Sequence, residues 1–193
     1  MSEIETFFDT MAERWDTFCM HDPERIRMIL ELIDLQPGAH ILDVGCGTGV
    51  LEHFLLGYHP SRIVAIDLSG QMIEKAKGKF HNHPEIVFRQ ADAHAFEGEY
   101  FDCIIIYSAY PHFMRPEELI RHLKDLLLPG GKLVICHSES KEQINRHHER
   151  HAEQLSLPLP PAHELAVLMK PYLDIQVILD TEKLYMVCGK RIS

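Results

Sequence analysis

Three glycines at alternate positions form the part of this sequence that most clearly suggests a chemical role. Gly45, Gly47 and Gly49 end a short apolar run. That run, residues 41–44, contains Asp43, and a helical pattern begins directly after the last glycine. Glycine has no Cβ, so its backbone can approach a ligand closely. A helix that starts there points its free N–H groups at the same ligand. The stretch therefore predicts a ligand-binding turn between a strand and a helix.

A carboxylate ends the next apolar run. Residues 62–67 read Arg-Ile-Val-Ala-Ile-Asp, so Asp67 lies at the carboxyl end of a predicted strand. In an open parallel sheet the ligand lies beyond these strand ends, where an acid can accept hydrogen bonds from ribose hydroxyls. The turn and the acid together fit either a dinucleotide or S-adenosylmethionine. The dinucleotide fingerprint is G-x-G-x-x-G, whereas the spacing here is G-x-G-x-G, with Val50 next.

Alternating strands and helices must hold these residues in place. Apolar runs predict strands at 41–44, 62–67, 86–89, 101–107 and 132–136, and an antiparallel hairpin at 175–179 and 184–188. Apolar spacing of three and four predicts helices at 3–19, 23–36, 50–55, 69–80, 116–127, 141–155 and 163–172. This order predicts an α/β fold, a Rossmann-like, doubly wound, seven-stranded sheet of five parallel strands and a closing antiparallel hairpin.

One domain over residues 1–193 accommodates all these elements, because the chain is too short for two comfortable domains. Residues 1–36 are expected to form an N-terminal helical cover with an aromatic-rich first helix. That helix either packs simply on the domain or closes as a mobile lid over a ligand. Residues 138–161 are expected to form a helical insertion over the substrate site.

Charge and cysteine content argue against a nucleic-acid-binding protein and against a zinc ribbon. The formal net charge is −10, from 29 acidic and 19 basic residues, which argues against a nucleic-acid partner; the 14 histidines offset much of it only below about pH 6. Five cysteines without a Cys-x-x-Cys pair indicate a reducing compartment and no zinc ribbon. The acidic N-terminus is unlike a signal peptide, and no apolar run approaches the roughly 18 residues of a membrane span. We expect a cytoplasmic protein.

Four ordered motifs over about residues 25–140 resemble those of the class I S-adenosylmethionine-dependent methyltransferases. Residues 42–49, Leu-Asp-Val-Gly-Cys-Gly-Thr-Gly, look like the first motif of that class. Asp67 and Asp92 match the acids that follow its second and third strands, and residues 128–133, Leu-Pro-Gly-Gly-Lys-Leu, match the turn before its fifth strand. Phe7-Phe8 and Ala12-x-x-Trp15-Asp16 resemble the N-terminal segment of the ubiquinone/menaquinone-type small-molecule methyltransferases.

The resemblance implies S-adenosylmethionine as the cofactor. The residues that it assigns to the cofactor are Asp43, Gly45, Cys46, Gly47, Gly49, Asp67, Leu68, Met72, Asp92 and Ala93. The glycines would make room for the methionine part, and Asp43 would help to orient its ammonium group. Asp67 would bind the ribose, and the residues from Leu68 onward would surround the adenine. Asp43 could instead be a strand-end residue satisfied by backbone N–H groups, and Asp67 and Asp92 could serve only as cap or turn residues.

The other end of the site carries the acceptor chemistry. A sulfonium is already a strong electrophile, so positioning is the main task, and a base is needed only for an acceptor that arrives protonated. In this architecture the ends of strands four and five face the methyl group. They deliver Tyr107, Tyr110, His112 and His137, of which His112 or His137 is the expected base or orienting group, with Tyr107 as a further catalytic candidate. Candidates for substrate binding are Trp15, Tyr110, Asn145 and His148.

The histidine-rich stretch over residues 137–151 is the least typical of the family. If residues 141–155 are helical, His148 lies on the face that turns inward, and His147 and His151 are four apart, a spacing able to hold a metal. Three interpretations stay open. The stretch is a solvated polar helix, a substrate-recognition helix that uses His148 and Asn145, or a metal site of His112, His137 and His148.

The sequence thus predicts methyl transfer from S-adenosylmethionine to a small-molecule acceptor by in-line displacement. Residues 108–112 lack the Asn/Asp-Pro-Pro-aromatic motif of enzymes that methylate nucleic-acid amino groups, which agrees with the acidic charge. The alternatives are a nicotinamide-dependent oxidoreductase and an S-adenosylmethionine-binding protein without turnover. The sequence leaves open the oligomeric state and whether the acceptor atom is O, N, C or S.

Overall fold

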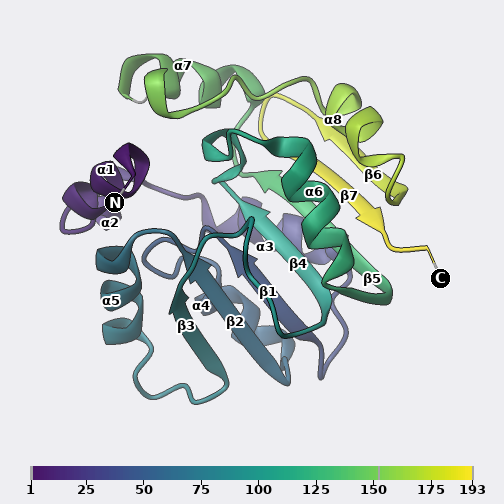
Figure 1. Cartoon of the computed structure of the whole chain (residues 1–193), viewed down its shortest axis with the longest axis horizontal. Coiled ribbons are helices and arrows are strands. Elements are labelled where there is room, and N and C mark those ends of the chain that lie inside the picture. The colour runs from purple at the N-terminus through teal and green to yellow at the C-terminus, as the bar shows by residue number, and fades with distance from the viewer. Residues whose placement is uncertain (1, 152, 193) are drawn as a thin grey trace.

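The computed structural model describes residues 2–151 and 153–192, which are organised around one mixed sheet (Figure 1). The strands follow the order β3-β2-β1-β4-β5-β7-β6. Neighbours from β3 to β5 pair in parallel, whereas β7 pairs antiparallel with both β5 and β6. The predicted sheet of five parallel strands and a closing antiparallel pair is confirmed. The strands are β1 His40–Val44, β2 Arg62–Asp67, β3 Ile86–Gln90, β4 Phe101–Tyr107, β5 Leu127–His137, β6 Asp174–Asp180 and β7 Tyr185–Lys190.

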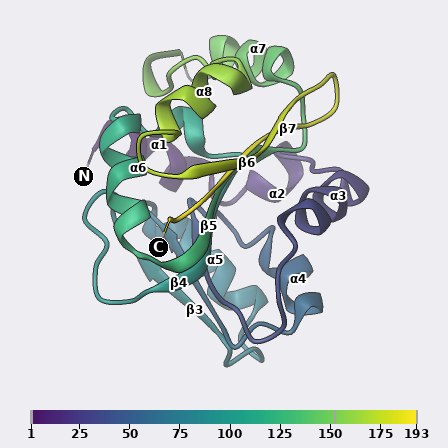
Figure 2. The ribbon, with the colours of Figure 1, turned by 90° about the vertical axis from the view of Figure 1, so that its right-hand side faces the viewer.

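Helices cover both faces of the sheet (Figure 2). Ile26, Leu55 and Ile73 bring α3, α4 and α5 into the apolar core on one face, and Leu119 and Met169 bring α6 and α8 into the core on the other. The helices are α1 Glu3–Met11, α2 Trp15–Phe18, α3 Pro23–Ile33, α4 Glu52–Leu55, α5 Gly70–Lys79, α6 Pro116–Asp125, α7 Lys141–His151 and α8 Ala162–Met169, with short 3-10 turns η1 Leu56–Tyr58, η2 Tyr110–His112 and η3 Glu153–Leu155. Within the described residues, no helix has the length and apolar character that crossing a bilayer requires.

Capping residues set several helix starts. The side chain of Ser2 accepts the N–H of Glu5 in a capping box at the start of α1. The side chain of Asp22 caps α3, which has Pro23 in its first turn as the sequence predicts. Ser69 caps α5 in the same way. Each cap satisfies N–H groups that the first helical turn leaves unpaired.

The predicted single helix over residues 3–19 is wrong. The chain turns at residues 12–14, so that α1 ends at Met11 and α2 begins at Trp15. The turn lets the rings of Trp15 and Phe8 pack edge to face, with 5.5 Å between centroids. It also lets Asp16 accept a hydrogen bond from the Thr48 hydroxyl at 2.5 Å. These contacts with the rest of the chain outweigh the continuous apolar spacing.

Several other predicted boundaries also differ from those observed. The helix after the glycine turn begins at Glu52 rather than at residue 50, because the turn that contains Gly49 continues through residue 51. Leu127 belongs to β5 rather than to α6. A Cβ on Gly131 would lie 2.9 Å from the Phe101 carbonyl oxygen, so this glycine lets β5 approach β4 before the predicted strand start. The helix predicted over 141–155 ends at His151.

Candidate active site

A cavity of about 320 Å³ opens at the carboxyl ends of β1, β2 and β4. This is the edge at which parallel α/β sheets bind their ligands. Its walls come from the glycine turn, from the loops after β2, β3 and β4, and from the cover helices α1 and α2. Predicted site residues that line it are Trp15, Gly45, Cys46, Gly47, Asp67, Leu68, Met72, Asp92, Ala93, Tyr107 and His112.

The glycine turn needs glycine at its positions. Gly45, Gly47 and Gly49 have φ values of +74°, +56° and +91°, which L residues with a side chain rarely adopt. A Cβ on Gly45 would lie 2.7 Å from the Cβ of Ala109, and a Cβ on Gly49 would lie 2.7 Å from the Phe80 ring. Gly45 and Gly47 line the cavity, whereas Gly49 packs behind it. Backbone N–H groups and carbonyls therefore form this wall of the cavity.

Asp67 fastens the turn to the start of α5. One carboxylate oxygen accepts the N–H of Gly47 at 2.9 Å, and the other accepts the N–H of Ser69 at 2.8 Å. Burial raises the pKa of Asp67, although these hydrogen bonds oppose the rise. The second predicted acid, Asp92, accepts the N–H of His94 at 2.9 Å. Both acids keep lone pairs for a ligand in the cavity.

Asp43 does not line the cavity, and the sequence analysis missed its partner, Glu52. Both side chains are buried directly behind the turn, within hydrogen-bonding reach of each other. Burial raises the pKa of Glu52 to about 7 and, together with Glu52, raises that of Asp43 well above its usual value. No other described residue donates a hydrogen bond to either Glu52 oxygen. A proton shared by the two carboxyl groups is the arrangement that satisfies both.

The cover helices close the cavity with aromatic side chains. Phe8 and Trp15 line it, and the indole nitrogen of Trp15 lies 3.5 Å from where a Cβ of Gly47 would be. Acidic residues of α1, α2 and the turn between them fasten these helices to the domain. The contacts are Asp9 with Ser69 and the Gln71 N–H, Glu13 with Lys75, Asp16 with Thr48 and Lys79, and Glu5 with Gln90.

Near the end of β4, a histidine that the sequence analysis missed lines the cavity. Nδ1 of His21 lies 2.8 Å from the Tyr107 hydroxyl, which in turn lies 2.7 Å from the hydroxyl of Ser138. Burial lowers the pKa of His21 and raises that of Tyr107. The only sequence signal was the position of His21 directly before the cap Asp22, which marks a fixed helix start but no chemistry.

His112 lines the cavity, and its ring packs between the rings of Phe8 and His148. Its ring packs edge to face against Phe8, at 4.9 Å between centroids, and against His148, at 4.8 Å. Its Nδ1 hydrogen-bonds the Leu155 carbonyl at 3.0 Å. Burial lowers its pKa, so the ring is neutral at pH 7.

Other predicted acceptor-side residues do not line the cavity. His137 is completely buried against Tyr185, neither of its ring nitrogens has a partner among the described residues, and burial followed by neighbouring histidines lowers its pKa to about 3. Tyr110 belongs to the apolar core. The amide of Asn145 is occupied by both the N–H and the carbonyl of Leu159. It therefore holds the loop after α7, and this geometry does not support substrate binding by Asn145.

The described side chains of the histidine-rich helix α7 form no metal site. No group of three His, Cys, Asp or Glu side chains in the described part of the chain could hold a metal ion, which corrects the reading of His112, His137 and His148 as ligands. His148 packs behind His112, and burial lowers its pKa to about 4. His147 pairs with Glu139 at 3.5 Å. The side chain of His151 lies outside the described part of the structure.

Comparison with known proteins finds a matching family and several similar proteins. Residues 42–135 match the family described as "Methyltransferase domain". The chain is 30% identical over 146 residues to a ubiquinone biosynthesis O-methyltransferase of Coxiella burnetii, covering 69% of this chain and 60% of the relative. It is 34% identical over 145 residues to a malonyl-[acyl-carrier protein] O-methyltransferase of Halalkalibacterium halodurans, covering 68% and 53%. The chain thus spans less than two thirds of the length of these curated relatives.

A solved structure shows the same fold over the whole chain. The N-methyltransferase NodS of Bradyrhizobium japonicum, in complex with S-adenosyl-L-homocysteine, superposes with a TM-score of 0.76 at 18% identity, and the match covers 100% of both chains. The family match, the motif turn and the strand order agree with one another. Together they identify residues 42–135 as a class I S-adenosylmethionine-dependent methyltransferase domain.

Proposed function

We propose that this protein transfers a methyl group from S-adenosylmethionine to a small molecule by in-line displacement. The observation that carries the proposal is the cavity beside the glycine turn, which Gly45 and Gly47 line together with Asp67. The two O-methyltransferase relatives support the same reaction class.

The residues around the turn fit this donor. Gly45 and Gly47 line the cavity where its methionine part would lie, and Gly45 also lets the turn approach Ala109 closely. Each oxygen of Asp67 accepts one N–H and keeps a lone pair that can accept a ribose hydroxyl. Leu68 and Met72 give apolar walls for the adenine. When bound, S-adenosylmethionine would supply an electrophilic methyl group on a sulfonium.

A small acceptor suits the covered cavity. Phe8 and Trp15 line it from the cover helices and make part of its wall aromatic and apolar, which suits a small organic acceptor. The net charge of −10 opposes a nucleic-acid acceptor. As parts of the proposal, residues 1–36 act as the cover and residues 138–161 as an insertion beside the acceptor. All five cysteines are free thiols, which supports a reducing compartment such as the cytoplasm.

Binding and turnover test the proposal together. Calorimetry should show that the protein binds S-adenosylmethionine, and labelled donor should pass its methyl group to members of a panel of phenols, amines, thiols and carboxylates. Gly45→Ala should weaken donor binding at least tenfold, because its Cβ would occupy the cavity wall at a strained φ.

Gly57→Ala is the matched control. A Cβ on Gly57 meets nothing within 4 Å, so this variant should bind the donor like the wild type. Binding of NAD without binding of S-adenosylmethionine would favour an oxidoreductase and refute the proposal. Donor binding without transfer to any member of the panel would indicate a binding protein instead.

A further inference from the structure

The His21–Tyr107–Ser138 chain of hydrogen bonds runs from the cavity wall into the domain. His21 and Tyr107 both line the cavity, whereas Ser138 is buried. The two contacts are 2.8 Å and 2.7 Å long, and the rings of His21 and Tyr107 lie 5.2 Å apart. A buried chain of this kind holds an imidazole in one orientation.

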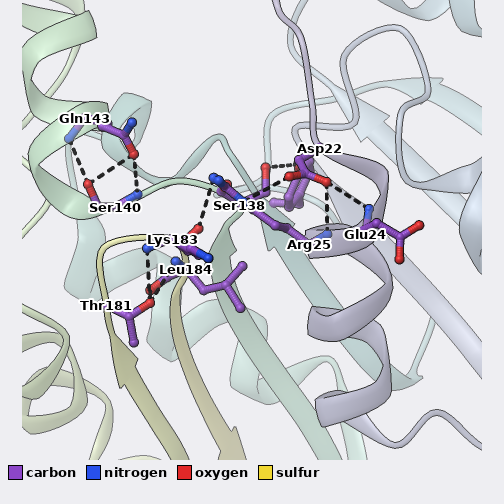
Figure 3. A network of polar contacts seen from close by, with 10 residues as sticks. Asp22, Glu24, Arg25, Ser138, Ser140, Gln143, Thr181, Lys183 and Leu184 are labelled. Carbon is purple, nitrogen blue, oxygen red and sulfur yellow. Dashed lines mark hydrogen bonds and ion pairs between the residues drawn. The ribbon is translucent and has the colours of Figure 1, made fainter.

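The backbone around His21 is tied down as well. Asp22, the next residue, caps α3 and forms an ion pair with Arg25 at 3.1 Å. Arg25 donates to the carbonyl of Ser138 at 2.9 Å and to that of Lys183 at 3.5 Å (Figure 3). The segment that carries His21 is thereby attached to the end of β5 and to the β6–β7 turn. His21 is held by the domain rather than by the cover helices alone.

One nitrogen of His21 stays available to a ligand. Nδ1 is engaged by Tyr107, and Nε2 has no partner among the described residues. When Nδ1–H donates to Tyr107 and Tyr107 donates to Ser138, Nε2 carries a lone pair. Burial lowers the pKa of His21, so the ring is neutral at pH 7. A neutral, oriented imidazole is the usual general base of enzymes.

We propose that Nε2 of His21 accepts the proton of an acceptor hydroxyl, with Tyr107 and Ser138 as positioning residues. This inference rests on the proposed function and names its substrate class. During transfer the acceptor O–H bond breaks and an O–CH₃ bond forms. The S–CH₃ bond of the donor breaks with its electron pair left on sulfur, which becomes a neutral thioether. The proton on Nε2 then passes to solvent.

The charges around the cavity favour a hydroxyl over other acceptors. An amine is a cation at pH 7, yet the only acids that line the cavity, among the described residues, are Asp67 and Asp92. They follow β2 and β3, whereas His21 lies beside β4, on the other side of β1. A carboxylate is already ionised and needs no base. Phe8 and Phe113 supply aromatic walls, which suits a phenol.

The test compares two phenols that differ in acidity. Phenol is protonated at pH 8.5, like a tyrosine hydroxyl with a pKa of about 10, whereas 4-nitrophenol is largely ionised there. His21→Gln should lower kcat for phenol about 100-fold, the usual range for a lost base, and leave the Kd for S-adenosylmethionine unchanged. With 4-nitrophenol at pH 8.5 the variant should match the wild type. Tyr107→Phe should lower kcat for phenol less and shift its pH profile.

Controls separate this inference from the proposed function. His163→Gln, an exposed change on α8, should leave both acceptors unaffected. Equal loss with both phenols would make His21 a structural residue and overturn the inference. A phenol-selective loss in His112→Gln but not in His21→Gln would also overturn the inference. Methylation of amines but not of phenols by the wild type would overturn it as well. Failure of the wild type to bind S-adenosylmethionine would overturn the proposed function itself.

Discussion

At the scale of single residues, the buried pair of Asp43 and Glu52 gives the molecule a titration near neutral pH. Two carboxyl groups that share one proton cannot both ionise without placing two negative charges in the core. The pKa of Glu52 lies at about 7 in the fold, against 4.5 in an unfolded chain. Between these values the folded state binds more protons than the unfolded state. The free energy of unfolding therefore falls as the pH rises from 4.5 to 7.

Glu52→Gln should remove this part of the pH dependence. The amide can donate a hydrogen bond to Asp43 at every pH, so it replaces the shared proton. We expect the variant to be more stable than the wild type at pH 8 by on the order of 1–3 kcal/mol, and similar to it at pH 5. Urea unfolding at the two pH values measures the difference. Glu31→Gln, on an exposed residue, is the control, and an identical pH dependence in Glu52→Gln would disprove the shared proton.

Single residues also show what a sequence can and cannot reveal. The motif residues Gly45, Asp67 and Asp92 are recognisable because their spacing repeats a known pattern, and all three line the cavity. Glu52 and His21 belong to no such pattern. Their roles depend on partners 9 and 86 positions away, Asp43 and Tyr107, which only the folded chain brings together.

At the scale of elements, the cover helices are held by charge rather than by a buried apolar face. None of the residues of α1 or α2 is fully buried. Asp9 accepts hydrogen bonds from the Ser69 hydroxyl at 2.5 Å and from the Gln71 N–H at 3.1 Å, at the start of α5. An element held mainly by partly exposed polar contacts opens at lower cost than the buried core.

Asp9→Ala should therefore speed release of the donor. Loss of hydrogen bonds to a charged group, partly exposed here, should raise the dissociation rate of S-adenosylmethionine about 3–10-fold. Trp15 is the single tryptophan of the chain and lines the cavity, so its fluorescence in stopped-flow displacement reports this rate. Glu3→Ala, in the same helix, is the control. Equal rates in wild type and Asp9→Ala would mean that the cover does not gate release.

The strands were easier to predict than the cover. Residues 62–67 and 101–107 are strands with the predicted bounds, because a parallel strand buried on both faces must be continuously apolar. The first helix carries an unbroken helical pattern, yet it bends so that Trp15 and Asp16 reach Phe8 and Thr48. The contact between Asp16 and Thr48, 32 positions apart, leaves no periodic signal in the sequence.

At the scale of the whole molecule, buried histidines make stability depend on pH in the opposite sense to the carboxyl pair. The pKa values of His137 and His148 are lowered to about 3 and about 4, from 6.5, chiefly by burial. Below pH 6.5 the unfolded chain binds protons that these rings do not bind in the fold. The histidines therefore lower the stability of the fold as the pH falls from 6.5 toward 3. The pair of Asp43 and Glu52 instead lowers it as the pH rises from 4.5 to 7.

His137→Phe should separate the two effects. Neither ring nitrogen of His137 has a partner, so at pH 7.5 the change should cost less than about 1 kcal/mol. At pH 4.5 the variant should exceed the wild type by on the order of 2 kcal/mol, because the unfolded histidine no longer gains from protonation. Urea unfolding across pH 4–8 measures both values. His163→Gln should follow the wild type, and parallel curves for His137→Phe and wild type would contradict this account.

The closed cover has a kinetic consequence for the proposed reaction. Phe8 contacts the acceptor-side residue His112, and Trp15 of the same cover lies against the donor-side Gly47. As part of the proposed function, we expect one movement of the cover to enclose both compounds, with the donor entering first. Initial-rate kinetics should show an ordered mechanism, in which the demethylated donor leaves last and inhibits competitively with fresh donor. Turnover at saturation would then be limited by reopening rather than by chemistry.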